Sequence, residues 1–202
     1  MKTIITILFL AGLCPLVQAQ DIPSALDDAL SAYADNDPQA ARQNLQQVLI
    51  DLNVLMGNKV LALMPPALGG LDANKNDDTV VGGTGFAGLM VERTYGGGDN
   101  NKKIEVTLAN DSPLMSMVNS FLSNDLLTGI MASQTGQKRV MVSGYKGMLE
   151  KSEWDDGTVA YTLNVPLDDT LFTFETNGFS SESEVLAMAQ QLNLNKIVAL
   201  LK

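Results

Sequence analysis

The residues from Lys102 to Asn124, KKIEVTLANDSPLMSMVNSFLSN, decide the fold, because an alternating pattern changes to a helical one within this stretch. Apolar residues first occupy every second position, at Ile104, Val106 and Leu108. Such alternation is typical of a strand that buries one face and leaves the other in water. We therefore predict a half-buried strand that ends at Asn110.

The second half of the stretch predicts a helix. Asp111 or Ser112 is expected to be its N-cap, since a side-chain oxygen there accepts hydrogen bonds from backbone N–H groups of the first turn. Pro113 fits the first turn because the donor that it lacks would have no partner there. Apolar residues then recur at three- and four-residue spacing, at Leu114, Val118, Phe121 and Leu122. This stripe predicts that the helix lies on a sheet.

The N-terminus has the pattern of a secretory signal peptide. Lys2 precedes an uncharged apolar run from Thr3 to Val17, which is too short to span a membrane comfortably. Val17-x-Ala19 supplies the residues that a signal peptidase requires, so we expect cleavage after Ala19. Cys14 follows Leu13, whereas a lipidation site has a small residue there, which disfavours a lipoprotein. The expected product is a periplasmic or secreted protein with no transmembrane segment.

Composition excludes several classes of function. The chain has 13 Lys and Arg against 23 Asp and Glu, and removal of residues 1–19 takes away Lys2 and changes the formal net charge from −10 to −11. An acidic surface gives no source of phosphate binding, so nucleic acid is not an expected partner. The mature chain would contain neither cysteine nor histidine, which removes disulfides, thiolate and imidazole catalysis, and the usual zinc ligands.

The rest of the chain predicts an α+β protein. Residues 20–66 are expected to form a helical hairpin, whose second helix begins at Pro38 behind the capping residue Asp37 and extends for roughly 40 Å. Each helix carries an apolar stripe, at Leu26, Leu30 and Tyr33 in the first and at Leu45, Val48, Leu49, Leu52, Leu55 and Val60 in the second. We expect the hairpin to be a helical arm packed on its own domain.

The hairpin is followed by a segment rich in Gly, Asn and Asp, residues 67–86, which is expected to be a flexible linker. Residues 87–202 alternate between strand and helix signals with hairpin-length connections. This order favours an antiparallel sheet with helices packed on one face. Ser181 and Glu184 form a capping box at the start of the last helical segment.

Three segments carry a resemblance to a known group of proteins: Ala62-Leu63-Met64-Pro65-Pro66-Ala67, Val91-Glu92-Arg93-Thr94-Tyr95 and Asp111-Ser112-Pro113-Leu114-Met115. Together with the order of elements, they resemble an uncharacterised family of proteobacterial periplasmic proteins. Members of that group often have Gly-Trp at the end of a Pro-rich linker, where this chain has Gly70-Leu71. The second half also resembles the PsbP-like fold, a sandwich that serves in binding and in the assembly of complexes. The resemblance implies a fold and supplies no catalytic residues.

Two motifs with enzymatic associations fall in the wrong context. Gly83-x-Gly85-x-x-Gly88 matches a dinucleotide fingerprint, but a strand follows it where a helix N-terminus is needed. Ser143-x-x-Lys146 has the spacing of the nucleophile and base of penicillin-binding proteins, but the Ser-Asp-Asn and Lys-Thr-Gly motifs are missing. Gly144 makes a turn between two strands the simpler interpretation.

Two carboxylate-rich segments are candidate sites. Asp72, Asn74 and Asn76 place oxygen ligands at alternate positions, which suits a weak calcium site, although the glycine and glutamate of a hand-type loop are missing. Acidic residues also surround Trp154, at Glu150, Glu153, Asp155 and Asp156, as a pair of sugar-cleaving carboxylates would. A solvated linker and a solvated turn are the simpler interpretations of these two segments.

The sequence therefore predicts a non-enzymatic periplasmic binding or accessory protein whose partner is another envelope protein. No catalytic, cofactor or metal residue is assigned, and the oligomeric state is open. The binding surface is either the exposed side of the hairpin or an open face of the sheet. The alternatives are a hydrolase that uses carboxylates or the pair Ser143 and Lys146, and a calcium-stabilised structural protein.

Overall fold

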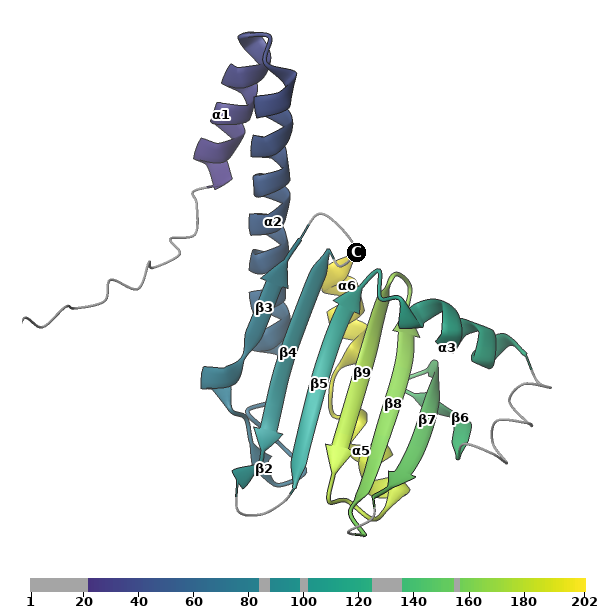
Figure 1. The fold of residues 1–202 in the computed structure, drawn as a ribbon. Helices are drawn as coiled ribbons and strands as arrows, with labels where there is room; N and C mark the ends of the chain where they lie inside the picture. Colours follow the sequence, from purple (N-terminus) through teal and green to yellow (C-terminus); the bar gives the residue numbers. More distant parts are fainter. Residues whose placement is uncertain (1–21, 84–87, 99–101, 125–135, 155–156) are drawn as a thin grey trace, which may run out of the picture.

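The computed structural model describes residues 22–83, 88–98, 102–124, 136–154 and 157–202. Two antiparallel helices, α1 (Ile22–Ala34) and α2 (Pro38–Leu63), form the predicted helical hairpin (Figure 1). Asp37 caps α2 as expected, because its carboxylate accepts from the backbone N–H of Ala40 at 2.9 Å. Asn36 adopts a left-handed φ of 60°, which asparagine tolerates and which lets the chain reverse.

An antiparallel sheet follows and confirms the predicted α+β fold. In the described part of the chain it has seven strands in the order β3-β4-β5-β9-β8-β7-β6. Their bounds are Thr79–Gly82 for β3, Leu89–Gly96 for β4, Lys103–Asn110 for β5, Gln137–Val142 for β6, Tyr145–Glu153 for β7, Val159–Leu167 for β8 and Thr170–Asn177 for β9. The predicted strand, β5, pairs with β9 and so joins the first three strands to the last four.

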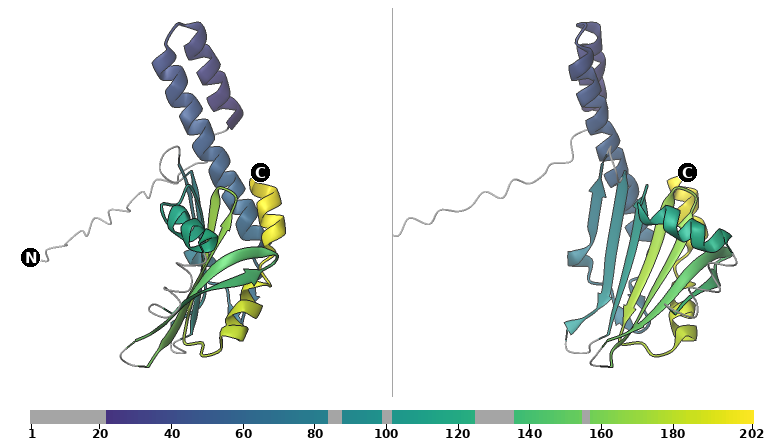
Figure 2. Two further views of the ribbon diagram at one scale, coloured as in Figure 1. Left: turned by 90° about the vertical axis from the view of Figure 1, so that its right-hand side faces the viewer. Right: turned by 45° about the vertical axis from the view of Figure 1, so that its right-hand side comes forward.

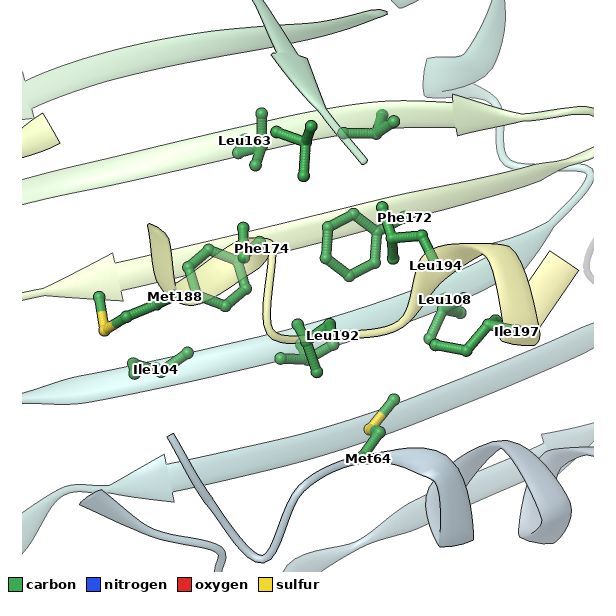
Figure 3. Close-up of a cluster of buried hydrophobic side chains, with 14 of the residues drawn as sticks. Met64, Ile104, Leu108, Leu163, Phe172, Phe174, Met188, Leu192, Leu194 and Ile197 are labelled. Atoms are coloured by element: carbon green, nitrogen blue, oxygen red, sulfur yellow. The ribbon is translucent and has the colours of Figure 1, made fainter. Parts of the chain in front are cut away.

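The main core lies on one face of this sheet. Ile104, Val106 and Leu108 of β5 are buried as the alternation predicted, and they lie beside Phe172 and Phe174 of β9. Helices α5 (Glu182–Ala189) and α6 (Leu194–Leu201) cover this face together with the C-terminal end of α2 (Figures 2 and 3). Figure 3 shows side chains from α5, α6 and the residues next to the helices lying over the sheet, among them Met64, Met188, Leu192, Leu194 and Ile197.

Helix α3 (Leu114–Ser123) lies on the opposite face of the sheet (Figure 2). Its buried residues Val118 and Phe121 pack with Met148 of β7 and Leu171 of β9. These two strand residues alternate with core residues such as Leu149 and Phe172, so they belong to the other face. The sheet therefore carries helices on both faces rather than on one, and α3 packs mainly on the part of its face that β7, β8 and β9 form, with Arg139 of β6 donating to the carbonyl of Phe121 at 3.0 Å.

The predicted N-cap of α3 is wrong in detail. The helix begins at Leu114 behind Pro113, and among the described residues no side chain caps it. Asp111 adopts a φ of 53°, and the backbone carbonyl of Ser112 accepts from the N–H of Met115 at 3.0 Å. The turn geometry after β5 therefore directs the backbone of Ser112, and not its hydroxyl, toward the first turn.

The segment that we expected to be a flexible linker is largely part of the fold. Strands β1 (Ala67–Leu68) and β2 (Leu71–Asp72) pair with each other, a short 3-10 helix η1 (Lys75–Asp77) follows, and β3 pairs with β4. Leu68 is buried and Val80 packs against the core. Isolated apolar residues within a polar segment therefore help to hold it in place. Residues 84–87 lie outside the described residues.

Candidate protein-binding surface

The hairpin projects from the sheet as an arm (Figures 1 and 2). We define the arm as residues 22–52, that is, α1 with the first half of α2. Helix α1 packs on α2, whereas the C-terminal half of α2 packs on β3, β4 and α6. Part of the hairpin is thus anchored on the domain as expected, and the other part extends beyond it.

Small side chains form the contact between the two helices of the arm. Ala25 and Ala29 of α1 are buried, as are Ala41 and Val48 of α2. Alanines let the helix axes approach closely, so the contact needs no large side chains. The larger apolar residues of both helices are therefore left outside this contact.

These larger residues are exposed on both helices. In α1, Leu26, Leu30 and Tyr33 are 40%, 68% and 74% exposed, and their spacing of four and three residues forms one stripe. In α2, Leu45, Leu49 and Leu52 are 48%, 53% and 38% exposed with the same spacing. We call these six residues the apolar stripe.

The two halves of the apolar stripe lie on the same side of the arm. At 100° per residue, the exposed residues of each helix lie about 60–90° around the helix axis from its buried contact residues. The direction of this displacement is the same in both helices. In two antiparallel helices that face each other, positions displaced in the same sense point to the same side. The two halves therefore lie on one side of the arm and adjoin where Leu26 is level with Leu45, while the α1 half extends toward the tip and the α2 half toward the sheet.

This surface is large for a single exposed apolar patch. Six large side chains exposed to this degree present on the order of 600 Å² of surface, the upper end of what the largest patch on a monomer reaches. Scattered apolar residues on a surface need no explanation, but a contiguous patch marks an interaction site. The apolar stripe is accordingly the strongest candidate for a binding surface in the described residues.

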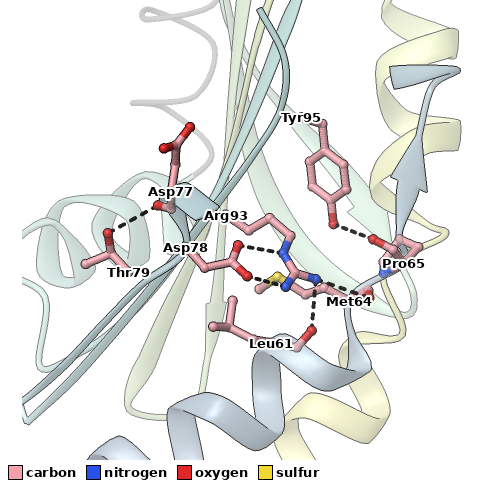
Figure 4. A network of polar contacts seen from close by, with 8 residues as sticks. All are labelled: Leu61, Met64, Pro65, Asp77, Asp78, Thr79, Arg93 and Tyr95. Carbon is pink, nitrogen blue, oxygen red and sulfur yellow. Dashed lines mark hydrogen bonds and ion pairs between the residues drawn. The ribbon is translucent and has the colours of Figure 1, made fainter. Parts of the chain in front are cut away.

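A buried arginine fastens α2 to the sheet (Figure 4). Arg93 of β4 is 5% exposed and donates from Nε and Nη2 to the carboxylate of Asp78, at 2.8 and 2.5 Å. Its Nη1 donates to the backbone carbonyls of Leu61 at 2.9 Å and of Met64 at 3.4 Å, at the C-terminal end of α2. The hydrogen bond with Asp78 raises the pKa of Arg93, so the guanidinium stays charged. One side chain thus ties β3, β4 and α2 together.

Close packing fixes α2 on β3 as well. A Cβ at Gly57 would lie 2.4 Å from Cγ1 of Val80, and a Cβ at Gly82 would lie 2.4 Å from the carbonyl oxygen of Ile50. The side-chain amide of Asn53 donates to the carbonyls of Gly83 and Gly88, at 2.9 and 2.7 Å. Helix and strand therefore approach backbone to backbone, which holds the arm at a set angle to the sheet.

A second surface is the part of the sheet face that α3 leaves uncovered. The register of the strands places polar residues in one row across six strands. The successive partners in this row are Thr94, Glu105, Glu175, Thr162, Glu150 and Gln137. Lys103 pairs with Glu105 at 2.6 Å. Desolvation on the sheet and the negative charge of Glu105 raise the pKa of Glu175, although Lys103 acts to lower it. We call this row and its neighbours the polar sheet face.

The structure places the predicted serine and lysine in a hairpin turn. Ser143 and Gly144 connect β6 to β7 with φ values of 51° and 89°, the left-handed pair of a type I′ turn. This geometry confirms the predicted turn. Lys146 lines an open hollow of about 620 Å³ between α3 and the ends of β7 and β8, together with Asn119, Ser120, Leu122, Ser123, Gly144, Tyr145 and Pro166.

The candidate calcium ligands lie in different short elements. Asp72 is exposed in β2, and Asn76 lies in η1. The side-chain amide of Asn74 donates to the carbonyl of Gly96 at 2.8 Å and so links the segment to the end of β4. In the described residues no group of three or more carboxylate, histidine or cysteine side chains is placed to hold a metal ion.

The carboxylates near Trp154 do not converge. Glu150 and Glu153 lie three residues apart in β7, and an odd separation puts side chains on opposite faces of a sheet. Glu150 accepts from the side-chain amide of Gln137 at 2.8 Å on the polar sheet face, while Glu153 lies 3.9 Å from Lys151. Trp154 is 57% exposed. Asp155 and Asp156 lie outside the described residues.

The glycine motif lies at the mouth of the β3–β4 hairpin. The N–H of Gly83 donates to the carbonyl of Gly88 at 2.8 Å, and β4 begins at the next residue, Leu89. A strand therefore follows the motif, as predicted from the sequence, and the carbonyls of both glycines bind Asn53 of α2. Gly85 lies outside the described residues.

Comparisons with known proteins leave the family open. No family model, no curated protein and no solved structure matches the chain. In the described residues no helix combines the length and the apolar character needed to cross a membrane. The candidate surfaces therefore rest on the geometry of this chain alone.

Proposed function

We propose that this chain is a non-enzymatic binding or accessory protein of the periplasm, and that it binds another protein through the apolar stripe of its arm. The observation that carries the proposal is the position of this stripe. Six large apolar side chains lie in water on a two-helix arm, while small side chains form the contact between the helices.

The anchoring of the arm supports the same function. A surface that is held by Arg93, Asn53 and the close approach at Gly57 and Gly82 loses little conformational entropy on binding. An amphipathic helical surface with anchors at three- and four-residue spacing is a common mode of protein recognition. The arm is thus suited to present a preformed apolar surface to a partner.

The expected location agrees with this use. The N-terminal pattern predicts export, and a mature chain without cysteine or histidine lacks the most common catalytic side chains. An accessory role that depends on a binding surface requires neither cysteine nor histidine. We therefore place the function in the surface of the arm rather than in a cleft.

The proposal is tested by cross-linked pull-down from the native envelope fraction, read by mass spectrometry. Removal of the whole hairpin is unsuitable, because Val60, Leu61 and Met64 belong to the core. Point variants avoid this problem. Leu30→Glu and Leu49→Glu should each lose the partner, because a carboxylate on the stripe would have to be desolvated on binding.

Ser31→Glu is the matched control. Ser31 is exposed and lies on the other side of α1, about 130° from the stripe. It should retain the partner at the level of the unmodified protein. Equal recovery of the partner by Leu30→Glu and by Ser31→Glu would contradict a binding role for the stripe.

A further inference from the structure

We propose that the open hollow between α3 and the ends of β7 and β8 is a further binding site, and that its ligand is a sugar acid, a monosaccharide that carries one carboxylate. The inference goes beyond the proposed function, because the hollow lies against the sheet and the apolar stripe lies on the arm. It is carried by the hydrogen-bonding groups that line the hollow and by the charge of Lys146.

The hollow has the size of a small-molecule site. Its volume of about 620 Å³ falls within the ~300–1,000 Å³ that is typical of ligand pockets. The second half of α3 forms one wall, and residues 144–146 with Pro166 of β8 form the other. Because the hollow is open to solvent, we expect a ligand that binds weakly and exchanges rapidly.

Lys146 gives the hollow a positive charge. Its side chain is exposed, and within the part of the chain that the structure describes it forms no ion pair. Lys151, the other lysine of β7, lies 3.9 Å from Glu153. The described residues that line the hollow include no carboxylate, so the acidic character of the protein does not cancel the charge there. One ammonium group suits a ligand with one negative charge.

Two serines of α3 supply hydrogen-bond acceptors. The hydroxyl of Ser120 donates to the carbonyl of Ser116 at 2.8 Å, and the hydroxyl of Ser123 donates to the carbonyl of Asn119 at 2.7 Å. Because each hydroxyl proton is used within the helix, the lone pairs of both oxygens are left to accept from a ligand. A ligand that donates to them needs hydroxyl groups, which a simple anion lacks.

The hollow also has apolar surface on both walls. Leu122 of α3 contributes to one wall and Pro166 to the other. Such surface contacts the C–H groups of a sugar ring, whereas a fully hydrated ion gains nothing from it. One negative charge, several hydroxyl donors and a C–H surface occur together in a sugar acid, and this combination is the reason for choosing that class of ligand.

Binding is tested by nuclear magnetic resonance on the full chain, exported, purified and labelled with nitrogen-15. D-Glucuronate is the probe, and it is titrated from about 0.1 to about 20 mM at pH 7 and low salt. It should shift the backbone amides of residues 119–123 and 144–146 in a saturable way, with a dissociation constant on the order of 1 mM. D-Glucose lacks the charge and acetate lacks the hydroxyl groups, so each should bind at least about fivefold more weakly.

Variants separate the two kinds of contact. Lys146→Gln should raise the dissociation constant for glucuronate by about fivefold and leave the weak response to glucose unchanged, because only the contact with the carboxylate is lost. Replacement of both Ser120 and Ser123 by alanine should raise it by about threefold or more. Helix α3 should remain folded in this double variant, since alanine is a better helix former than serine.

Lys151→Gln is the matched control. Lys151 belongs to the same strand as Lys146, but the odd separation of the two residues puts it on the other face of the sheet. This variant should bind glucuronate as the unmodified protein does.

Three results would overturn the inference. They are the absence of saturable shifts with glucuronate, an unchanged affinity in Lys146→Gln, and an affinity for acetate equal to that for glucuronate. The last result would reduce the hollow to a nonspecific contact with anions. None of them bears on the apolar stripe, whose role is tested separately by Leu30→Glu.

Discussion

The guanidinium of Arg93 faces the carboxylate of Asp78 with two hydrogen bonds, of 2.8 and 2.5 Å, in a site where the two side chains are 6% and 14% exposed. The same guanidinium donates to carbonyls at the end of α2. The ion pair is therefore the point at which the C-terminal end of α2, the residue before the edge strand β3 and the central sheet are joined (Figure 4).

Replacement of Arg93 by methionine should lower the free energy of unfolding by about 3–5 kcal/mol. The change leaves the carboxylate of Asp78 unpaired in a buried place and removes the donor to Leu61 and Met64. Urea denaturation followed by circular dichroism measures it. Lys151→Met breaks the exposed pair with Glu153 and should change stability by less than about 1 kcal/mol. Similar effects of the two substitutions would contradict the anchoring role of Arg93.

Gly82→Ala should destabilise the protein by about 1–3 kcal/mol. The new Cβ would lie 2.4 Å from the carbonyl oxygen of Ile50, and a backbone atom cannot move aside as a side chain can. Gly88→Ala is the control, because its Cβ would lie 3.9 Å from Nδ2 of Asn53, an ordinary contact. It should change the free energy of unfolding by less than about 0.5 kcal/mol. A Gly82→Ala protein as stable as Gly88→Ala would show that α2 does not lie so close to β3.

Glu175→Gln should stabilise the protein at pH 7. Desolvation and the charges of Glu105 and Glu92 raise the pKa of Glu175, so its ionised form is less favourable in the folded state than in the unfolded chain. For a raised carboxyl pKa, the unfavourable contribution is present above the folded pKa and disappears as protonation proceeds on lowering the pH. Because this side chain is partly in solvent, the gain should be only a few tenths of a kcal/mol.

Melting temperatures of the variant and the unmodified protein at pH 7 and pH 4 measure this effect. The difference between them should be positive at pH 7 and smaller at pH 4. Glu153→Gln, on the other face of the sheet, provides the comparison. A Glu175→Gln protein that melts below the unmodified one at pH 7 would show that Lys103 outweighs the two glutamates.

Much of the fold was predictable from local patterns, because a two-residue or 3.6-residue period reports directly on strands and helices. Ile104, Val106 and Leu108 are buried as their alternation predicted, and Asp37 and Ser181 are the caps that their positions indicated. The pairing of strands that are far apart in the sequence left no such periodic signal. Glu105 and Glu175 become direct neighbours only through the register of β5 with β9.

The candidate site shows the same limit. The periodicity of Leu26, Leu30 and Tyr33 predicted an apolar stripe but not whether another element covers it. The small residues Ala25 and Ala29 form the helix contact instead, and a sequence pattern alone does not rank these two faces. Asp78, fifteen residues before Arg93, was assigned to a linker because its surroundings are polar. The role of Asp78 depends on the packing of α2 against the sheet, which is a long-range contact.

The most direct test of the protein-binding arm is site-specific photo-cross-linking in cells that produce and export the full chain. A photoreactive amino acid is placed at Leu30 in one variant and at Ser31 in another. We predict a cross-linked product with a single protein species from position 30 and none from position 31, because only position 30 lies on the apolar stripe. Products of equal yield from both positions, or none from either, would contradict it.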